Sequence, residues 1–441
     1  MSASVATPTT DAPDLTITPA FAAARAALEA GRNVLLTGKA GTGKTTFLDW
    51  FRQQTDKNIA VVAPTGVAAL NVRGQTIHSF FELKPGFLTP DHRFRIRNRK
   101  LFKALDLLIV DEISMVRADL FDAMAAILKQ YGPEPRRPFG GVQICLVGDL
   151  LQLPPIISPG EREAFHHLYQ GPYFFQAQSW QPEQFTTIAF DDVFRQRDPA
   201  FVALLNQIRA GVRTPDVLTA LNQRVGELAV TEGVVTLTTT NARAAQINEL
   251  RMAALPHTGR VYTGDIAGTF TASGQNLPAP EALLLKPGAQ VMFTRNDVPG
   301  RRWVNGTLGV VRHLEADVVI VEVMRGDRPR LYEVEREMWK AVKYRLDEAS
   351  GEIAEEETGH YTQFPLTPAW AVTIHKSQGK TLDRVLIDLD RGAFAPGQLY
   401  VALSRCRTLA NLTLSRPISL SDIRVDPRVV GFLQGRCDAA D

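Results

Sequence analysis

The chain has 441 residues, of which 45% are hydrophobic, and a formal net charge of +2. This length allows about three domains with sizeable cores, and the near-neutral charge means that binding to nucleic acid has to be argued from local sites. The three cysteines, Cys145, Cys406 and Cys437, are far apart, which excludes a disulfide framework or a zinc site and is typical of a reducing compartment. No apolar run approaches the ~18 residues that span a membrane.

The N-terminal stretch, residues 1–18, is small, polar and proline-containing. It lacks the basic start and the apolar core of a secretory signal, so we predict a disordered lead-in. The alanine-rich stretch FAAARAALEAG, residues 21–31, then predicts a helix with Gly31 as its C-cap.

A glycine-rich stretch follows, TGKAGTGKTTF at residues 37–47, between a strand expected at 33–37 and a helix expected at 45–54. The pattern G-x-x-x-x-G-K-[ST] is met by Gly38, Gly43, Lys44 and Thr45. Such a turn points several backbone N–H groups into one hollow, and the helix end adds partial positive charge. Lys44 can reach the outer phosphates of a nucleotide, and the Thr45 hydroxyl can ligate Mg²⁺. The stretch therefore predicts a nucleoside triphosphate site; a tight turn without a ligand is the alternative.

A basic stretch, DHRFRIRNRK at residues 91–100, has five lysines or arginines in ten residues. Its arginines Arg93, Arg95, Arg97 and Arg99 alternate with Phe94 and Ile96. A strand would put the four arginines on one face, whereas a helix is equally possible from Asn98 onward. A solvated run of charge is the third interpretation.

Apolar stretches that predict strands occur in both halves of the chain. In the first half they are residues 33–37, 59–65, 107–112 and 143–149. Helical stretches lie between several of them, which indicates a parallel sheet covered on both faces. The second half repeats this style with strands predicted at residues 234–241, 384–389 and 412–415. We therefore predict an α/β protein with two parallel-sheet domains.

Acidic residues end the third of these strands, LLIVDE, at Asp111 and Glu112. Carboxylates at the carboxyl end of the sheet would lie beside the phosphate loop, where Asp111 could hold Mg²⁺ and Glu112 could act as general base on the attacking water. Helix capping by these acids is the alternative. The next strand is followed by Asp149 and Gln152, and Gln152 could sense the γ-phosphate.

Phosphoryl transfer also needs positive charge on the side of the nucleotide opposite the phosphate loop, and two arginines are candidates to supply it. Arg195 lies in VFRQ and Arg405 in YVALSRCR. Either could instead be an ordinary salt-bridge residue. If both lie in the second α/β domain, they close a cleft whose other wall carries the phosphate loop, so that ATP would hold the two domains together and hydrolysis would release them.

Between about residues 263 and 361 the pattern changes to short strands separated by Gly, Pro and Asp. Strand-like runs lie at residues 289–295, 308–314 and 318–324, which predicts a small β-barrel inserted into the second domain. Trp303 in this part is either a core residue or a platform for a base.

Seven segments, taken in order, resemble the helicase motifs of superfamily one. They are GKAGTGKTT (38–46), APTGVAALNVRGQTIHSFF (63–81), IVDEISMV (109–116), GDLLQLPP (148–155), VFRQ (193–196), AWAVTIHKSQGKTLD (369–383) and YVALSRCR (400–407). Residues 118–155 also resemble the stretch that marks the PIF-one family, and 360–383 is similarly close. The resemblance covers roughly residues 30–416 and identifies the PIF-one/RecD branch.

This resemblance implies a 5′-to-3′ DNA helicase, driven by ATP and Mg²⁺, that unwinds duplex or structured DNA such as G-quadruplexes and R-loops. Roles in replication, repair, recombination and telomere maintenance are implied with it. An ATP-driven translocase that strips proteins from DNA is one alternative, and a non-catalytic DNA-binding subunit with a decayed site is another. The intact Lys44, Asp111, Glu112 and Arg405 argue against decay.

The resemblance also places site residues. It implies catalytic roles for Lys44, Asp111, Glu112, Gln152, Arg195 and Arg405, and metal binding by Thr45 and Asp111. Nucleotide contacts are implied for Gly38, Gly41, Thr42, Gly43, Lys44, Thr45, Thr46, Gln152, Arg195, Gly379 and Arg405. Contacts to single-stranded DNA are implied for Pro64, Thr65, Gly66, His78, Thr373, His375, Lys376 and Ser377. N-capping is the alternative role for the serine and the threonines. Gln378 and Gly379 are expected to couple the DNA track to the nucleotide cleft.

The family pattern divides the chain into RecA-like domain 1A (19–188, with a wedge insertion 1B at about 80–104), RecA-like domain 2A (189–262 plus 362–441) and an SH3-like barrel 2B (263–361). Related helicases often place a glutamine ahead of the phosphate loop to read adenine, whereas residues 15–31 contain none, so other nucleoside triphosphates could serve. We expect a monomer that binds single-stranded and forked DNA, with no membrane partner, in a bacterial-type cytoplasm in association with the nucleoid.

Overall fold

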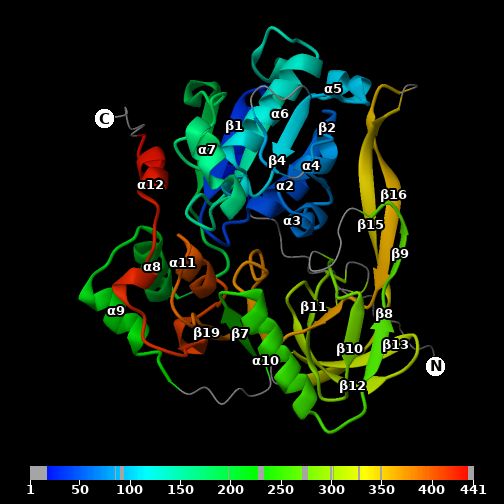
Figure 1. The fold of residues 1–441 in the computed structure, drawn as a ribbon, viewed down its shortest axis with the longest axis vertical. Coiled ribbons are helices and arrows are strands. Elements are labelled where there is room, and N and C mark those ends of the chain that lie inside the picture. Colours follow the sequence, from blue (N-terminus) through cyan, green and yellow to red (C-terminus); the bar gives the residue numbers. More distant parts are fainter. Residues whose placement is uncertain are drawn as a thin grey trace, which may run out of the picture.

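The computed structural model describes residues 17–84, 86–89, 94–196, 198–226, 233–270, 277–297, 300, 302–325, 328–347 and 350–435. Residues 1–16 of the predicted disordered lead-in lie outside the described residues. Arg93 and Cys437 lie outside them too. Figure 1 shows one α/β half above and a second below it on the left, with a strand-rich part below on the right. None of the helices described is both long and apolar enough to span a membrane.

The first half contains a sheet of six parallel strands in the order β3-β2-β4-β5-β1-β6. The strands are β1 (Asn33–Gly38), β2 (Ile59–Ala63), β3 (Gln75–Thr76), β4 (Leu107–Val110), β5 (Gln143–Gly148) and β6 (Phe185–Phe190). The central strands β4 and β5 are buried along their whole length, as expected for a parallel sheet covered on both faces. All four strands predicted in this half are confirmed.

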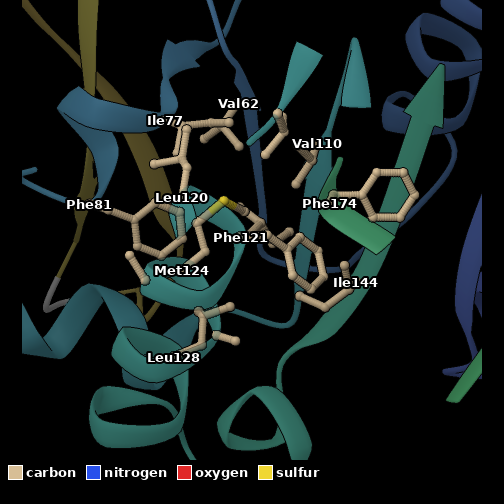
Figure 2. Packing of buried hydrophobic residues seen from close by; sticks show 14 of the residues in the cluster. Val62, Ile77, Phe81, Val110, Leu120, Phe121, Met124, Leu128, Ile144 and Phe174 are labelled. Atoms are coloured by element: carbon tan, nitrogen blue, oxygen red, sulfur yellow. The ribbon is translucent and has the colours of Figure 1, made fainter. Parts of the chain in front are cut away.

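Helices cover both faces of this sheet because successive strand residues point to opposite sides. Val34 and Leu36 of β1 pack in one cluster with helices α1 (Pro19–Glu29) and α2 (Lys44–Arg52). Leu35 packs in the opposite cluster, which includes helix α6 (Ala118–Tyr131). Figure 2 shows this second cluster, where Phe121, Met124 and Leu128 of α6 face strand residues such as Val62, Val110 and Ile144. The sheet is thus the middle layer of three.

Shorter helices complete the first half: α3 (Gly66–Asn71), α4 (Ile77–Phe80), α5 (Arg99–Ala104) and α7 (Arg162–Leu168), with 3₁₀ turns at Ile113–Met115, Pro138–Gly141, Pro159–Glu161, Phe174–Gln176 and Pro182–Gln184. In the basic stretch, the Asn98 side chain caps α5 by accepting a hydrogen bond from the Leu101 N–H (3.3 Å). Phe94 and Ile96 are buried, whereas Arg95 and Arg97 are exposed. The predicted alternation is therefore present at residues 94–97, which form no strand, and the helical alternative from Asn98 is confirmed.

The second half is built on a four-stranded parallel sheet in the order β18-β7-β19-β20. Its strands are β7 (Val234–Thr238), β18 (Ala371–Thr373), β19 (Arg384–Asp388) and β20 (Leu412–Leu414), and its helices are α8 (Pro199–Arg209), α9 (Pro215–Asn222), α10 (Asn241–Ala254) and α11 (Gln398–Leu403), with 3₁₀ turns at Leu409–Asn411 and Leu420–Asp422. The three strands predicted here are confirmed, and with them the α/β class with two parallel sheets.

Antiparallel strands occupy the sequence between α10 and β18. They are β8 (Arg260–Thr263), β9 (Asp265–Gly268), β10 (Ala282–Leu285), β11 (Gln290–Phe293), β12 (Leu308–Leu314), β13 (Val318–Arg325), β14 (Arg328–Glu335), β15 (Glu337–Leu346), β16 (Ile353–Gln363) and β17 (Leu366–Pro368). They form sheets in the orders β14-β13-β12-β11-β17, β15-β16-β9 and β10-β8. Trp303 is only 4% exposed and stacks on Phe293 at 4.3 Å, so it is a core residue. The predicted limits of the domains stay predictions.

A long hairpin, β15–β16, leaves this strand-rich part and runs along the first half, on the right of Figure 1. Tyr344 near its tip belongs to the hydrophobic cluster of the first half and contacts the ring of Phe80 edge-on at 5.9 Å. The Tyr344 hydroxyl accepts a hydrogen bond from the Val61 N–H (3.2 Å), and the Ile353 N–H donates to the Asn58 side chain (3.0 Å). The hairpin therefore joins the strand-rich part to the first half.

The C-terminal helix α12 (Pro427–Leu433) also returns to the first half. Phe432 stacks on Phe175 with centroids 4.3 Å apart and the rings 7° from parallel. The Tyr173 hydroxyl donates a hydrogen bond to Asp426 Oδ2 (2.9 Å), and Val429 is buried in the same cluster. The end of the chain thus packs on the domain with which it began.

Candidate nucleotide site and nucleic-acid track

A cavity of about 840 Å³ lies beyond the carboxyl ends of β1, β4 and β5, between the two α/β halves. Most of the residues predicted to be catalytic or to contact the nucleotide line it: Gly41, Thr42, Gly43, Lys44, Thr45, Thr46, Asp111, Glu112, Gln152, Arg195, Gly379 and Arg405. Gly38 does not line the cavity, but its carbonyl accepts a hydrogen bond from Lys44 Nζ (2.9 Å). Such clefts between domains are common places for ligand sites.

The phosphate loop has the backbone that its glycines predict. Gly41 and Gly43 have φ angles of +80° and +83°, which side chains rarely allow. A Cβ on Gly41 would lie 2.5 Å from Cβ of Arg195, so this glycine also lets the far wall approach. Lys44 Nζ donates to the carbonyls of Gly38 and Lys39 (2.9 and 2.8 Å). Burial lowers the pKa of Lys44, although the negative charges of Asp149, Glu112 and Asp111 act to raise it.

The two acids follow β4 at the floor of the cavity. Burial raises the pKa of Asp111 to about 6 and the pKa of Glu112 to about 7, the latter also because of the neighbouring Asp111. Glu112 has a φ of 51° in the left-handed region, a strain of about 1–3 kcal/mol that proteins often tolerate at functional sites. A carboxylate with a raised pKa is suited to accept a proton near neutral pH.

The donor set suits Mg²⁺ bound together with a nucleotide. Thr45, which has a hydroxyl group, and Asp111, which has a carboxylate, both line this cavity. The described ranges contain no group of three or more His, Cys, Asp or Glu residues that could hold a metal by themselves. Mg²⁺ is usually bound by one or two protein ligands plus substrate phosphates, so these residues fit the ion.

The far wall of the cavity carries the two arginines. Arg195 donates to the carbonyls of Ser404 and Gly379 (3.4 and 3.3 Å). Arg405 is 1% exposed and donates to the carbonyls of Val401 (2.9 Å), Ser377 (3.3 Å) and Lys380 (3.4 Å) and to the Ser404 hydroxyl (2.8 Å). Burial, reinforced by Arg195, lowers the pKa of Arg405 to about 9. These bonds go to neutral oxygens, and neither arginine forms a salt bridge with any of the residues that the structure describes.

A chain of side-chain hydrogen bonds joins the two walls. Gln378 Nε2 donates to Glu112 Oε2 (3.1 Å) and to Gln152 Oε1 (3.0 Å). Gln152 Nε2 donates in turn to Asp149 Oδ2 (3.2 Å). Gln378 follows directly on the predicted DNA segment that ends at Ser377, so that segment, the candidate base and the candidate γ-phosphate sensor are in contact.

Sequence reasoning missed two members of this network. Arg209 at the end of α8 donates to Asp149 Oδ1 (3.0 Å). Tyr400 on α11 accepts from the Ala40 N–H of the phosphate loop and donates to Asp149 Oδ2, both at 3.1 Å. Burial alone would raise the pKa of Asp149, but the positive charges of Arg209 and Lys44 outweigh it and hold that pKa below its usual value. Tyr400 begins the segment YVALSRCR, and its presence in the same motif as Arg405 could have indicated that it belongs to the site. Arg209 lies in a helix of ordinary composition, which gives no such indication.

The predicted DNA residues lie on both halves. Thr65 caps α3 by accepting from the Ala68 N–H (3.2 Å), and Thr373 accepts from the Lys376 N–H (3.2 Å). Ser377 is fully buried and its hydroxyl donates to the Ile374 carbonyl (2.8 Å). The capping alternative therefore describes Thr65, whereas the Thr373 hydroxyl stabilises a turn and the Ser377 hydroxyl acts as a donor.

The other DNA candidates are more open. Thr65 and Lys376 are exposed, while Pro64, Gly66, His78 and His375 are half-buried. Burial lowers the pKa of both histidines and so favours their neutral forms. Contact of these residues with DNA stays a prediction.

Comparison with known proteins agrees with this architecture. A family model described as PIF1-like helicase matches residues 19–214. The ATP-dependent DNA helicase Pif1 of Bdellovibrio bacteriovorus is 35% identical over 431 residues, covering 95% of this chain and 92% of that protein. The human ATP-dependent DNA helicase PIF1 is 34% identical over 426 residues, covering 91% of this chain and 61% of its own length.

Solved structures give the same result. Bacteroides sp Pif1 in complex with ADP-AlF4 matches with a TM-score of 0.87 and 36% identity, over 96% of this chain and 97% of that one. Bacteroides Pif1 bound to single-stranded DNA matches with a TM-score of 0.69 and 37% identity, over 96% and 97%. Two parallel-sheet domains that face each other across a phosphate loop define a helicase of the RecA-like class. The chain belongs to the PIF1-like helicase family, which confirms the resemblance seen in its sequence.

Proposed function

We propose that the protein is an ATP-dependent DNA helicase that moves 5′-to-3′ on single-stranded DNA and unwinds duplex or structured DNA. The observation that carries this proposal is the cavity between the two halves, with the phosphate loop and acids on one wall and Arg195 and Arg405 on the other. The Bdellovibrio and human relatives are both named ATP-dependent DNA helicases.

The chemistry follows from the placement of the side chains. Lys44 and the loop N–H groups bind the β- and γ-phosphates. Thr45 and Asp111 would hold Mg²⁺, which would supply positive charge against the phosphates. Glu112 accepts the proton of the attacking water, and Arg405 with Arg195 stabilises the charge that develops on the transferred group.

Coupling to DNA follows from Gln378. Its amide bonds both Glu112 and Gln152 (3.1 and 3.0 Å), so loss of the γ-phosphate and movement of Gln152 would alter the position of residues 373–377. The first half would hold the DNA backbone near Thr65 and His78, and the second half near His375 and Lys376. Bacteroides Pif1 has been crystallised bound to single-stranded DNA, which supports a track of this kind. Closing and opening of the cavity would then move one grip relative to the other.

Direction is the part of the proposal that rests on the sequence resemblance. We would measure unwinding of duplexes with only a 5′ tail, only a 3′ tail or blunt ends, under single-turnover conditions with Mg²⁺. We expect unwinding from the 5′ tail alone, weakening with salt because the grip is mostly to phosphates. Preferential unwinding from the 3′ tail would overturn the direction, and DNA-stimulated hydrolysis without unwinding would favour a translocase that strips proteins.

Action as a monomer is a further part of the proposal. A Bacteroides structure concerns unwinding of forked double-stranded DNA by two coordinating Pif1 helicases, so the number of copies needs its own measurement. We expect the single-turnover rate to saturate hyperbolically with protein concentration, and a sigmoidal rise would contradict a monomer. Action on DNA in a bacterial-type cell implies a cytoplasmic, nucleoid-associated location.

A further inference from the structure

A second cavity, of about 570 Å³, lies where the chain passes from the second half to helix α12. Its lining comes from Arg213 between α8 and α9, from Pro396 before α11, and from residues within 421–428 that lead into α12. These helices lie on the left of Figure 1, away from the strand-rich part. The volume is within the range of about 300–1,000 Å³ that is usual for ligand pockets, so the cavity is large enough for more than a single ion.

Two arginines of this lining are fixed in place but have no anionic partner. Arg213 Nε donates to the Ile423 carbonyl and Arg424 Nε donates to the Ser421 carbonyl, each at 2.9 Å. Both arginines are exposed, and their terminal nitrogens form no hydrogen bond or salt bridge with any residue that the structure describes. A guanidinium held through Nε presents its two terminal nitrogens together, which suits the paired oxygens of a carboxylate or a phosphate.

The third arginine of the lining, Arg428, is already paired. Its Nε and Nη2 donate to Oδ1 and Oδ2 of Asp426 (2.9 and 2.6 Å), and its guanidinium lies over the ring of Tyr173 at 5.5 Å. Asp426 is the one acidic residue among the described residues of the lining, and it is buried in this pair. The charges of Arg213 and Arg424 are therefore not compensated within the cavity.

The cavity lies apart from the residues predicted to bind single-stranded DNA. In the second half these residues, 373–377, lie at the end of β18, which is one edge strand of the sheet β18-β7-β19-β20. The segment that leads to the cavity follows β20, the opposite edge strand, three strand spacings of about 4.8 Å away. The two arginines are therefore not part of the predicted DNA track.

The remaining lining favours a peptide over a nucleic acid. Among the described residues that line the cavity there is no aromatic ring and no side-chain amide, so nothing there stacks on a base or reads its edge. A DNA duplex is too broad to enter a cavity of this size. Pro396, Val425 and Pro427 add apolar surface beside the two guanidinium groups. A segment that carries both carboxylates and apolar side chains matches both kinds of surface.

We propose that this cavity, the arginine pocket, binds an acidic peptide segment of a partner protein. Carboxylates of the segment pair with Arg213 and Arg424, and an apolar side chain packs on Pro396, Val425 and Pro427. Because the pocket joins the second half to α12, which packs on the first half, the bound segment also holds α12 in place. The pocket lies outside both the nucleotide cavity and the predicted DNA track, so the partner binds while the protein is on DNA.

The direct test is fluorescence anisotropy with a fluorescein-labelled peptide of eight residues in which aspartate and leucine alternate. The full chain is first saturated with single-stranded DNA, so that the predicted DNA track is not open to the peptide. We expect a peptide with asparagine in place of aspartate to bind at least about tenfold more weakly, the scale of hydrogen bonds to charged groups. A peptide with serine in place of leucine should bind about fivefold more weakly, because it buries less apolar surface. Equal binding of the aspartate and asparagine peptides would overturn the proposal.

Variants of the two arginines place the peptide in the pocket. Arg213→Ala and Arg424→Ala should each weaken binding of the aspartate peptide about tenfold or more. The lysine variants should lose about threefold, since lysine keeps the charge without the paired donors. Arg330→Ala is the matched control, at an exposed arginine of β14 outside the pocket. Unchanged binding in both alanine variants would overturn the proposal.

Two further measurements show that the variants are intact and which anion the pocket takes. DNA-stimulated hydrolysis of ATP should stay close to wild type, because neither arginine lines the nucleotide cavity. If one alanine variant proves unstable, the other variant and the peptide series still decide the proposal. Unlabelled aspartate peptide should displace the labelled one, whereas equal concentrations of inorganic phosphate or of a blunt DNA duplex should not. Displacement by phosphate would show a site for single oxyanions, and displacement by the duplex would show a nucleic-acid site; either result would overturn the proposal.

Discussion

At the nucleotide cavity the two halves of the molecule face each other with charged side chains, Lys44, Asp111 and Glu112 on one wall and Arg195 and Arg405 on the other. At the hairpin β15–β16 the strand-rich part meets the first half through the ring of Tyr344 against Phe80, and at helix α12 the second half meets it through Phe432 against Phe175. Electrostatic forces in a cleft change when a γ-phosphate arrives or leaves, whereas packed apolar rings carry no charge that would respond to it. We infer that ATP controls the first contact and that the other two set how firmly the halves stay together.

The largest effect is expected for Lys44→Ala, which removes the phosphate-facing charge. Hydrolysis with saturating DNA should fall by about 10³-fold, the upper scale for losing one preorganised charge. The thermal unfolding midpoint should stay close to wild type, because the bonds of Lys44 Nζ are confined to its own loop. A variant with near-normal turnover would remove this residue from the site.

Next in size is Glu112→Gln, which keeps the shape of the side chain but cannot accept a proton. We expect hydrolysis about 100-fold slower with nucleotide and DNA binding retained, measured by single-turnover hydrolysis and equilibrium binding. Glu161→Gln, a change at a carboxylate outside the cavity lining, serves as control. A rate within a few-fold of wild type would mean that another group is the base.

The contact made by α12 gives a smaller effect of a different kind. Phe432→Ala should lower the free energy of unfolding by about 2 kcal/mol, below the range for a fully buried phenylalanine because this ring is half-buried. Urea unfolding measures this, and KM for ATP should be unchanged. Leu433→Ala, at an exposed neighbour, is the control. A shift in KM would show that this apolar contact takes part in the nucleotide cycle and would break the contrast.

The smallest effect is expected for Tyr344→Phe in the hairpin. It removes the hydroxyl that accepts from the Val61 N–H and leaves the ring in place. We expect a loss of about 1 kcal/mol in urea unfolding, the usual value for one hydrogen bond. Tyr332→Phe, on β14 of the strand-rich part, is the matched control. Equal stability of Tyr344→Phe and wild type would mean that the hairpin docks through its ring alone.

The nucleotide cavity could be predicted from the sequence because its chemistry is local. The phosphate loop needs glycines at fixed positions, and strand β4 leads directly into Asp111 and Glu112. The arginines were recognised through short motifs, although their pairing with the phosphate loop depends on a fold that brings Arg195 to Gly41.

The apolar contacts could not be predicted, because each joins segments that are far apart and individually unremarkable. Tyr344 has the alternating neighbours of any strand residue, and nothing near it in sequence indicates that Val61 is its partner. Helix α12 has seven residues, and the aromatic ring against Phe432 lies more than two hundred residues earlier. Arg209 was missed for the same reason, since its partner Asp149 belongs to the other half.

The left-handed backbone of Glu112 implies a conflict between folding and catalysis. The conformation aims a carboxylate into the cavity at a cost of about 1–3 kcal/mol, and burial adds to that cost by opposing ionisation. Glycine would adopt the same φ without strain and carry no charge. Selection for stability alone would therefore replace this residue, and under the proposed function its presence marks a position where the protein gives up robustness in exchange for turnover.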